Sequence, residues 1–106
     1  MTPDWQEHPE AREELIQAHG YYLEVGGSDL GDLFIDKMEA TATLIVRWPS
    51  AAPRYQVRRR RSVVRSLRIR SFPYRLIYTA RAGSILVLAY AHEKRRPGYW
   101  EHRLDR

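Results

Sequence analysis

The hydrophobic periodicity of this chain changes once, and that change limits the folds available to it. Up to residue 48 apolar residues recur every three or four positions, as on one face of a helix, whereas from residue 62 they alternate, as in a strand. Helices followed by strands predict an α+β fold. At 106 residues the chain has room for a single core. We therefore expect one domain over residues 1–106, made of a helical hairpin over about 9–48, a basic loop over 49–61, a sheet meander over about 62–92 and a tail over 93–106.

The first half is predicted to form two antiparallel helices. Pro9 suits the first helical position, and the pair Gly26-Gly27 is expected to end the first helix. The predicted buried faces comprise Ala11, Leu15, Ala18 and Tyr22 in the first helix, and Leu30, Phe34, Met38, Thr41, Ile45 and Trp48 in the second.

The second half is predicted to form an antiparallel sheet of three to four strands. In the first strand, Val63, Arg65, Leu67 and Ile69 are expected on one face and Val64, Ser66, Arg68 and Arg70 on the other, polar face. Residues 75–81 and 84–91 form a hairpin through Ala82-Gly83. Residues 85–89 are apolar on both faces, so this strand should lie centrally, under the helices.

Charge divides the chain at the same place as periodicity. Residues 1–46 hold two cations and ten acids, a net charge of −8, whereas residues 47–106 hold sixteen cations and three acids, a net charge of +13. A solvated surface is the ordinary explanation for such charges. This excess instead favours a basic sheet face that meets a polyanion or an acidic partner, with the acidic helices covering the opposite face.

Composition excludes several classes of protein. Cysteine is absent, so disulfides, thiolate metal sites and cysteine nucleophiles are excluded. The four histidines lack metal-ligand spacing, and we expect no metal and no cofactor. No apolar window is long enough to span a bilayer and no signal-peptide pattern is present, which predicts a cytoplasmic protein without a membrane partner.

The most unusual stretch follows the last predicted strand. Its target-binding candidates are a histidine, three cations and two aromatic residues around a Pro-Gly turn: His92, Lys94, Arg95, Arg96, Tyr99 and Trp100. A histidine at a strand end, such as His92, is more often a surface or hydrogen-bonded capping residue than an acid or base. The two aromatic residues are equally interpretable as a cover that folds onto the sheet. Residues 58–61, four consecutive arginines (Arg58, Arg59, Arg60 and Arg61), are a candidate nucleic-acid patch or a solvated loop segment.

Four segments in order resemble one family. They are residues 8–24, residues 29–34, the stretch from Arg65 through Phe72-Pro73-Tyr74-Arg75 to Ala80, and residues 87–100. Together they resemble the RelE/ParE toxin superfamily of type II toxin-antitoxin systems, nearest to its ParE-like branch, over almost the whole chain. The family usually opens with a short hydrophobic strand, whereas residues 2–7 offer little beyond Trp5, so the first strand is not assured.

This resemblance implies a compact toxin that a cognate antitoxin neutralises, with no small-molecule substrate. Members similar to ParE act on DNA gyrase and need no nuclease chemistry of their own. Members similar to RelE cut mRNA in the translating ribosome. The charge division fits both routes.

The residues needed for RNA cleavage are incompletely matched. The resemblance assigns Arg75 and Arg68 to two catalytic cations of the nuclease branch and Arg95 to a third. His92 is a further candidate because histidine is the residue type whose unperturbed pKa lies near neutrality. Ser66 replaces a further lysine, and the catalytic tyrosine would fall at Glu101, with Tyr99 nearby. We therefore favour gyrase inhibition, with mRNA cleavage as the alternative, and a plain nucleic-acid-binding module or a degenerate toxin as further alternatives.

Overall fold

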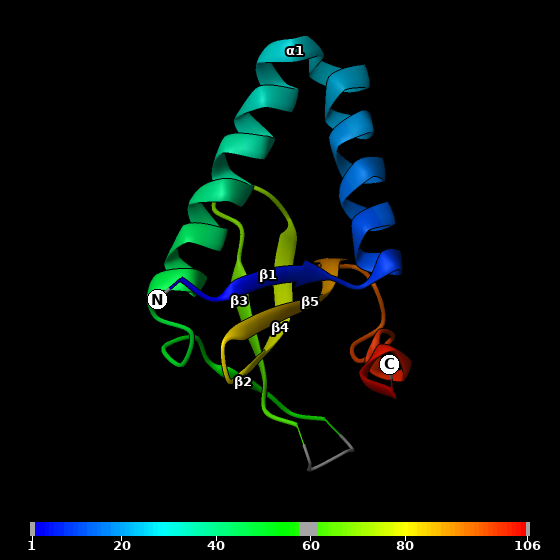
Figure 1. The fold of residues 1–106 in the computed structure, drawn as a ribbon. Coiled ribbons are helices and arrows are strands. Elements are labelled where there is room, and N and C mark those ends of the chain that lie inside the picture. The colour runs from blue at the N-terminus through cyan, green and yellow to red at the C-terminus, as the bar shows by residue number, and fades with distance from the viewer. Residues whose placement is uncertain (1, 58–61, 106) are drawn as a thin grey trace.

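In the computed structural model, which describes residues 2–57 and 62–105, one bent helix packs on a five-stranded sheet (Figure 1). The elements are β1 (Asp4–Glu7), α1 (Pro9–Arg47), β2 (Arg54–Tyr55), β3 (Val64–Arg68), β4 (Tyr74–Arg81), β5 (Ser84–His92) and the short 3₁₀-helix η1 (Glu101–Asp105). The predicted α+β class is confirmed. The arginine patch predicted at residues 58–61 lies outside the described residues.

The predicted helical hairpin is a single helix, α1, that is sharply interrupted at Gly27. Gly27 has φ 70° and ψ −168°, a combination that only glycine adopts without strain. The chain reverses there, and the two arms diverge from the bend toward the sheet (Figure 1). At the start of α1, His8 Nδ1 accepts a hydrogen bond from the Glu10 amide at 3.1 Å, satisfying one of the helix's unpaired donors. Pro49 follows its last residues.

The sheet is larger than predicted and is mixed. Its strand order is β1-β5-β4-β3-β2, and β1 runs parallel to β5, pairing Asp4 with Ser84 and Glu7 with Val87. The N-terminal strand therefore forms despite its weak hydrophobicity, because the backbone of β5 supplies its hydrogen bonds. The antiparallel meander of β3, β4 and β5 is as predicted, and β5 lies inside the sheet between β1 and β4.

The face of the sheet toward α1, the helix-side face, carries the larger hydrophobic cluster. The predicted first-arm residues Ala11, Leu15, Ala18 and Tyr22 are all buried. They pack with Phe34 and Ile45 of the second arm and with Leu76, Tyr78, Val87 and Tyr90 of the sheet. Leu30 and Met38 are partly buried against this cluster, but Trp48 is 54% exposed, so its predicted place in the core is wrong.

The opposite face, the tail-side face, is not the open polar surface that the sequence predicted. It carries a second cluster formed by Val64, Ile77, Leu88, Ala89 and Ala91, covered by Trp100. Val64 is 1% exposed and Ser66 is buried, whereas Val63 is 43% exposed. Val64 lies on the face opposite Leu67 and Ile69, as predicted, but that face is covered and not open, and the expected place of Val63 on a buried apolar face was wrong. Alternation alone does not reveal that the C-terminal residues fold back over the face of Val64.

Candidate functional site

The residues singled out after the last strand gather around one groove. This basic groove has a volume of about 270 Å³ and lies between the end of the sheet and the residues that follow β5. Its lining includes Arg75, His92, Arg95, Arg96, Tyr99 and Trp100, together with Tyr55 of β2. Five of the six target-binding candidates therefore meet here, and the nuclease-branch candidate Arg75 joins them. Lys94 is not part of the lining.

The arginines of the groove are held by specific contacts. Arg75 donates from Nε to the Ser66 hydroxyl, so the serine that replaces a lysine in the resemblance helps to orient the arginine. Arg95 lies over the ring of Tyr99, with its guanidinium carbon 3.9 Å from the ring centroid, a cation-π geometry. Arg68 pairs in register with Arg75, but it lies outside the groove lining and forms an ion pair with Glu93 at 2.9 Å.

The two candidate proton-transfer groups, His92 and Tyr99, are both engaged in structural contacts. His92 Nδ1 accepts a hydrogen bond from the Lys94 amide at 3.0 Å, and its ring lies edge-on to Tyr74 at 5.0 Å. The Tyr99 hydroxyl donates to the Glu14 carboxylate. Burial, followed by this hydrogen bond, raises the pKa of Tyr99 well above its ordinary value. Tyr99 thus stays protonated at neutral pH and is poorly suited to act as a general base.

Trp100 is a packing residue in this structure. Its side chain is 1% exposed and sits in the tail-side cluster, with the Tyr55 ring at 5.1 Å. The structure therefore favours the covering role over direct contact with a target, and of the two aromatic residues it leaves Tyr99 partly accessible in the groove.

The sequence did not indicate three further residues that shape this region. Tyr55 forms one wall of the groove, while Glu14 and Arg103 form an ion pair at 2.9 Å that ties the residues after β5 to α1. Their spacing along the chain carries no local pattern, since Glu14 and Arg103 are 89 residues apart. Their pairing is visible only in three dimensions.

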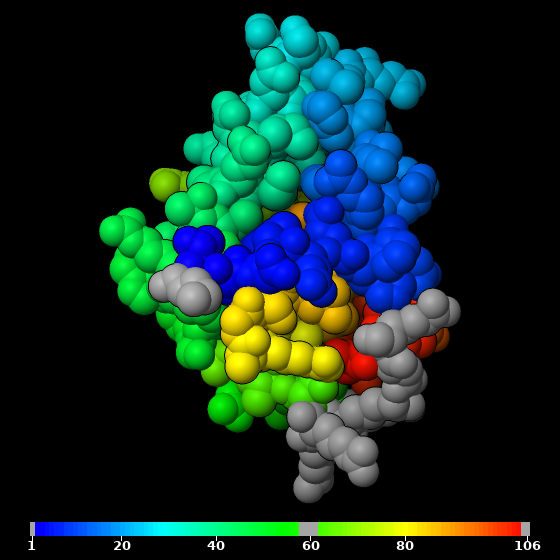
Figure 2. Space-filling view, viewed as in Figure 1, coloured from blue at the N-terminus to red at the C-terminus, as the bar shows by residue number. Residues whose placement is uncertain are grey.

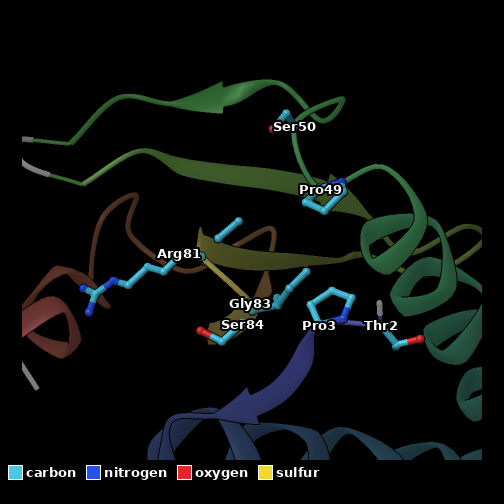
Figure 3. Close-up of a pocket in the computed structure, with 10 residues that line it drawn as sticks. Thr2, Pro3, Pro49, Ser50, Arg81, Gly83 and Ser84 are labelled. Carbon is cyan, nitrogen blue, oxygen red and sulfur yellow. The ribbon is translucent and has the colours of Figure 1, made fainter.

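Two other hollows lack the chemistry of a reaction site. A pocket of about 370 Å³ at the β4–β5 turn is lined mainly by small side chains and prolines, and Figure 3 shows the Arg81 side chain pointing away from the other labelled residues. A larger groove of about 480 Å³ lies between the two helix arms and β1, with a mostly apolar lining that includes Trp5, Leu15 and Met38. Of its charged residues, Arg12 and Glu7 pair with each other at 3.2 Å, and Glu39 is the third.

Neither a metal centre nor a membrane span is found within residues 2–57 and 62–105. That part of the chain contains no group of three or more histidine, aspartate or glutamate side chains arranged to hold an ion. None of its helices is long and apolar enough to cross a bilayer.

The architecture is an α+β domain with a hairpin-shaped helix on one face of the sheet and a C-terminal segment on the other. A solved structure described as the chromosomal ParDE TA system from P. aeruginosa contains a chain that superposes on this one with a TM-score of 0.70. The match covers 86% of this chain and 96% of that chain at 14% sequence identity. No family model and no curated protein matches the sequence. The resemblance stated from the sequence is thereby confirmed at the level of the fold.

Proposed function

We propose that this chain is the toxin of a type II toxin-antitoxin system and acts in the cytoplasm on DNA gyrase, with a cognate antitoxin as its neutralising partner. The observation that carries the toxin assignment is the fold shared with a chain of the ParDE system over 96% of that chain. The four sequence segments that resemble the RelE/ParE toxin superfamily extend over nearly the same part of the chain, which supports the assignment further.

The composition of the basic groove supports the gyrase route. A toxin that inhibits another enzyme needs a surface that binds this enzyme, whereas a nuclease needs a general acid and a general base next to its substrate. The groove offers cations and aromatic surface, from Arg95, Arg96 and Tyr99. Its candidate proton carriers, His92 and Tyr99, are held in structural hydrogen bonds. We infer that Arg95, Arg96 and the exposed side of Tyr99 contact the target.

One observation favours the ribosome-dependent nuclease as the second candidate. Arg75 is held in place by Ser66 and lines the same groove as Arg95, so two cations are available to stabilise a phosphorane-like transition state. If this is the activity, Arg75→Ala removes a transition-state contact worth about 2.7–4 kcal/mol and lowers the cleavage rate by roughly 10²–10³.

The deciding experiment is to induce the chain in a bacterial host and follow labelled thymidine and labelled methionine incorporation over the first minutes. An earlier fall in thymidine incorporation is the expected result. If methionine incorporation falls first, gyrase inhibition is wrong and the nuclease assignment replaces it. If neither falls, the chain is a degenerate toxin or a plain nucleic-acid-binding module.

Point variants are the appropriate second step. Truncation before Pro97 would remove Trp100 from the tail-side cluster and so would confuse loss of folding with loss of binding. Arg95→Gln with Arg96→Gln keeps Trp100 in the tail-side cluster and should reduce growth arrest if these cations bind gyrase. The control is Arg70→Gln, which removes an exposed arginine outside the groove lining and should leave growth arrest unchanged.

A further inference from the structure

The carboxylate of Glu14 lies at a junction between three parts of the fold. Its side chain is 15% exposed and comes from the first arm of α1. It accepts hydrogen bonds from both terminal nitrogens of Arg103, at 2.9 and 3.1 Å, from the Tyr99 hydroxyl, and from the Tyr90 amide of β5 at 3.2 Å. One buried carboxylate therefore joins the helix, the sheet and residues 93–105, which we call the tail segment.

The edge of β5 explains why a carboxylate is needed at this place. β1 ends at Glu7, and the last contact of this parallel pairing is the His8 amide bonded to the Val87 carbonyl. Immediately beyond, the register of β4 and β5 shifts and Leu88 has no Cα partner on β4, as in a β-bulge. The Leu88 carbonyl accepts from Arg103 at 2.8 Å, and the Tyr90 amide donates to Glu14. Side chains thus supply the backbone partners that a longer β1 would supply.

The same contacts set the position of the basic groove. Tyr99 is held in place by the hydrogen bond from its hydroxyl to Glu14. The guanidinium carbon of Arg95 lies 3.9 Å from the centroid of the Tyr99 ring, on the groove side, and that of Arg103 lies 5.2 Å from it. Figure 2 shows the tail segment, in red, directly below the blue start of α1. Other attachments of the tail segment include the burial of Trp100, the ion pair of Glu93 with Arg68 at 2.9 Å, and the contacts of Glu10 with His102 and Arg103, at 3.1 and 3.8 Å.

We propose that Glu14 is the positioning residue of the target-binding surface: its carboxylate holds the tail segment on the sheet and thereby places Tyr99 and Arg95 in the groove. Glu14 itself touches no target. Without its charge, Arg103 keeps a buried cation with a reduced set of partners, so the docked tail segment is destabilised relative to an open one. The link to growth arrest rests on the proposed toxin function, whereas the link to tail docking does not.

The first test measures docking directly. In a chain carrying Trp5→Phe and Trp48→Phe, Trp100 is the sole tryptophan, and acrylamide quenching of its fluorescence reports its exposure. Glu14→Gln should make Trp100 accessible to the quencher. The Arg103 amide donates a hydrogen bond to the Trp100 carbonyl, so its hydrogen exchange also reports docking. Glu14→Gln should accelerate this exchange about a hundredfold, because a charge pair then loses one partner.

The matched control is Glu13→Gln, which removes the same charge from an exposed neighbouring position. It should leave quenching and exchange as in the parent chain. Circular dichroism establishes that each variant keeps its helix. If Glu14→Gln unfolds the whole chain, Tyr99→Phe is tested instead, since it removes one hydrogen-bond donor to the Glu14 carboxylate. It should increase both the quenching of Trp100 and the exchange of the Arg103 amide, each by a smaller factor. Unchanged burial of Trp100 in the folded variant would overturn the proposal.

The second test joins docking to function. Glu14→Gln should reduce growth arrest, and Tyr99→Phe should add little in the Glu14→Gln background, because both changes act through the same contact. If Trp100 is released but growth arrest is undiminished, the positioning role is wrong while the toxin function stands. If the parent chain causes no growth arrest, the toxin function is wrong, and quenching and exchange still decide the docking role.

Discussion

The two faces of the sheet are both covered, but by elements of very different size. On the helix-side face, two arms of a 39-residue helix bring a continuous set of aliphatic and aromatic side chains to β4 and β5. On the tail-side face, the tail segment contributes one fully buried side chain, Trp100, to a smaller cluster, with Tyr99 and Leu104 partly buried against it, and polar contacts to Glu14 and Glu10 add to its attachment. The helix-side face provides the stability of the fold, while the tail-side face is secured by a few contacts next to the candidate site.

The largest loss of stability is expected from a substitution that removes a buried side chain from the helix-side face. Phe34 is fully buried, and its ring lies 5.1 Å from both Tyr22 and Phe72. Phe34→Ala should lower the free energy of unfolding by about 3–5 kcal/mol, measured by chemical denaturation. Leu33→Ala, at an adjacent position that is 42% exposed, serves as the control and should change stability by less than about 0.5 kcal/mol.

Damage to the tail-side face should have a smaller and more local effect. Trp100→Ala leaves the cluster of Val64, Ile77 and Leu88 without its cover. Because the tail segment can then detach while the sheet and α1 stay folded, we expect a loss of about 2–3 kcal/mol instead of the full cost of an internal cavity. Hydrogen exchange should rise in η1 far more than in β4. Equal acceleration in both elements would show that the two faces unfold as one unit.

The difference between the faces also explains what the sequence could reveal. The helix-side face follows from local patterns: the spacing of Ala11, Leu15, Ala18 and Tyr22 predicted its buried arm, and all four are buried. The clustering of His92, Arg95 and Tyr99 followed from their proximity along the chain. The tail-side face depends on contacts between distant residues, so the burial of Val64 and the pairing of Glu14 with Arg103 had no local signature, and the covering role of Trp100 was one of two interpretations that the sequence left open. The same holds for β1, whose partner β5 lies some eighty residues away along the chain.

A substitution at the bend of α1 should destabilise the packing of the helix on the sheet and leave the docking of the tail segment unchanged. Gly27→Ala places a side chain at φ 70° and should cost about 1–3 kcal/mol, although no atom lies within 4 Å of the added carbon. The control is Gly20→Ala, at an equally open position within the helix, which should stabilise the chain by about 0.5–1 kcal/mol. Thermal denaturation measures both. Trp100 quenching should stay unchanged in each, because neither position contacts the tail segment.

The smallest expected effect is a dependence of tail docking on pH. A hydrogen bond from His102, with further attraction from Arg103, lowers the pKa of Glu10 below its ordinary value of 4.5. A lowered pKa in the folded chain means that this contact stabilises docking fully above pH 4.5 and is lost as the pH falls through the pKa of the folded state. Glu10 is solvent-exposed, so the loss should be slight compared with that caused by Glu14→Gln. In the single-tryptophan chain, acrylamide quenching of Trp100 should increase modestly below pH 4.5, and Glu10→Gln should remove part of that increase. An identical acid response in the Glu10→Gln chain would show that the exposed contact contributes nothing, leaving Glu14 and the burial of Trp100 to hold the tail segment.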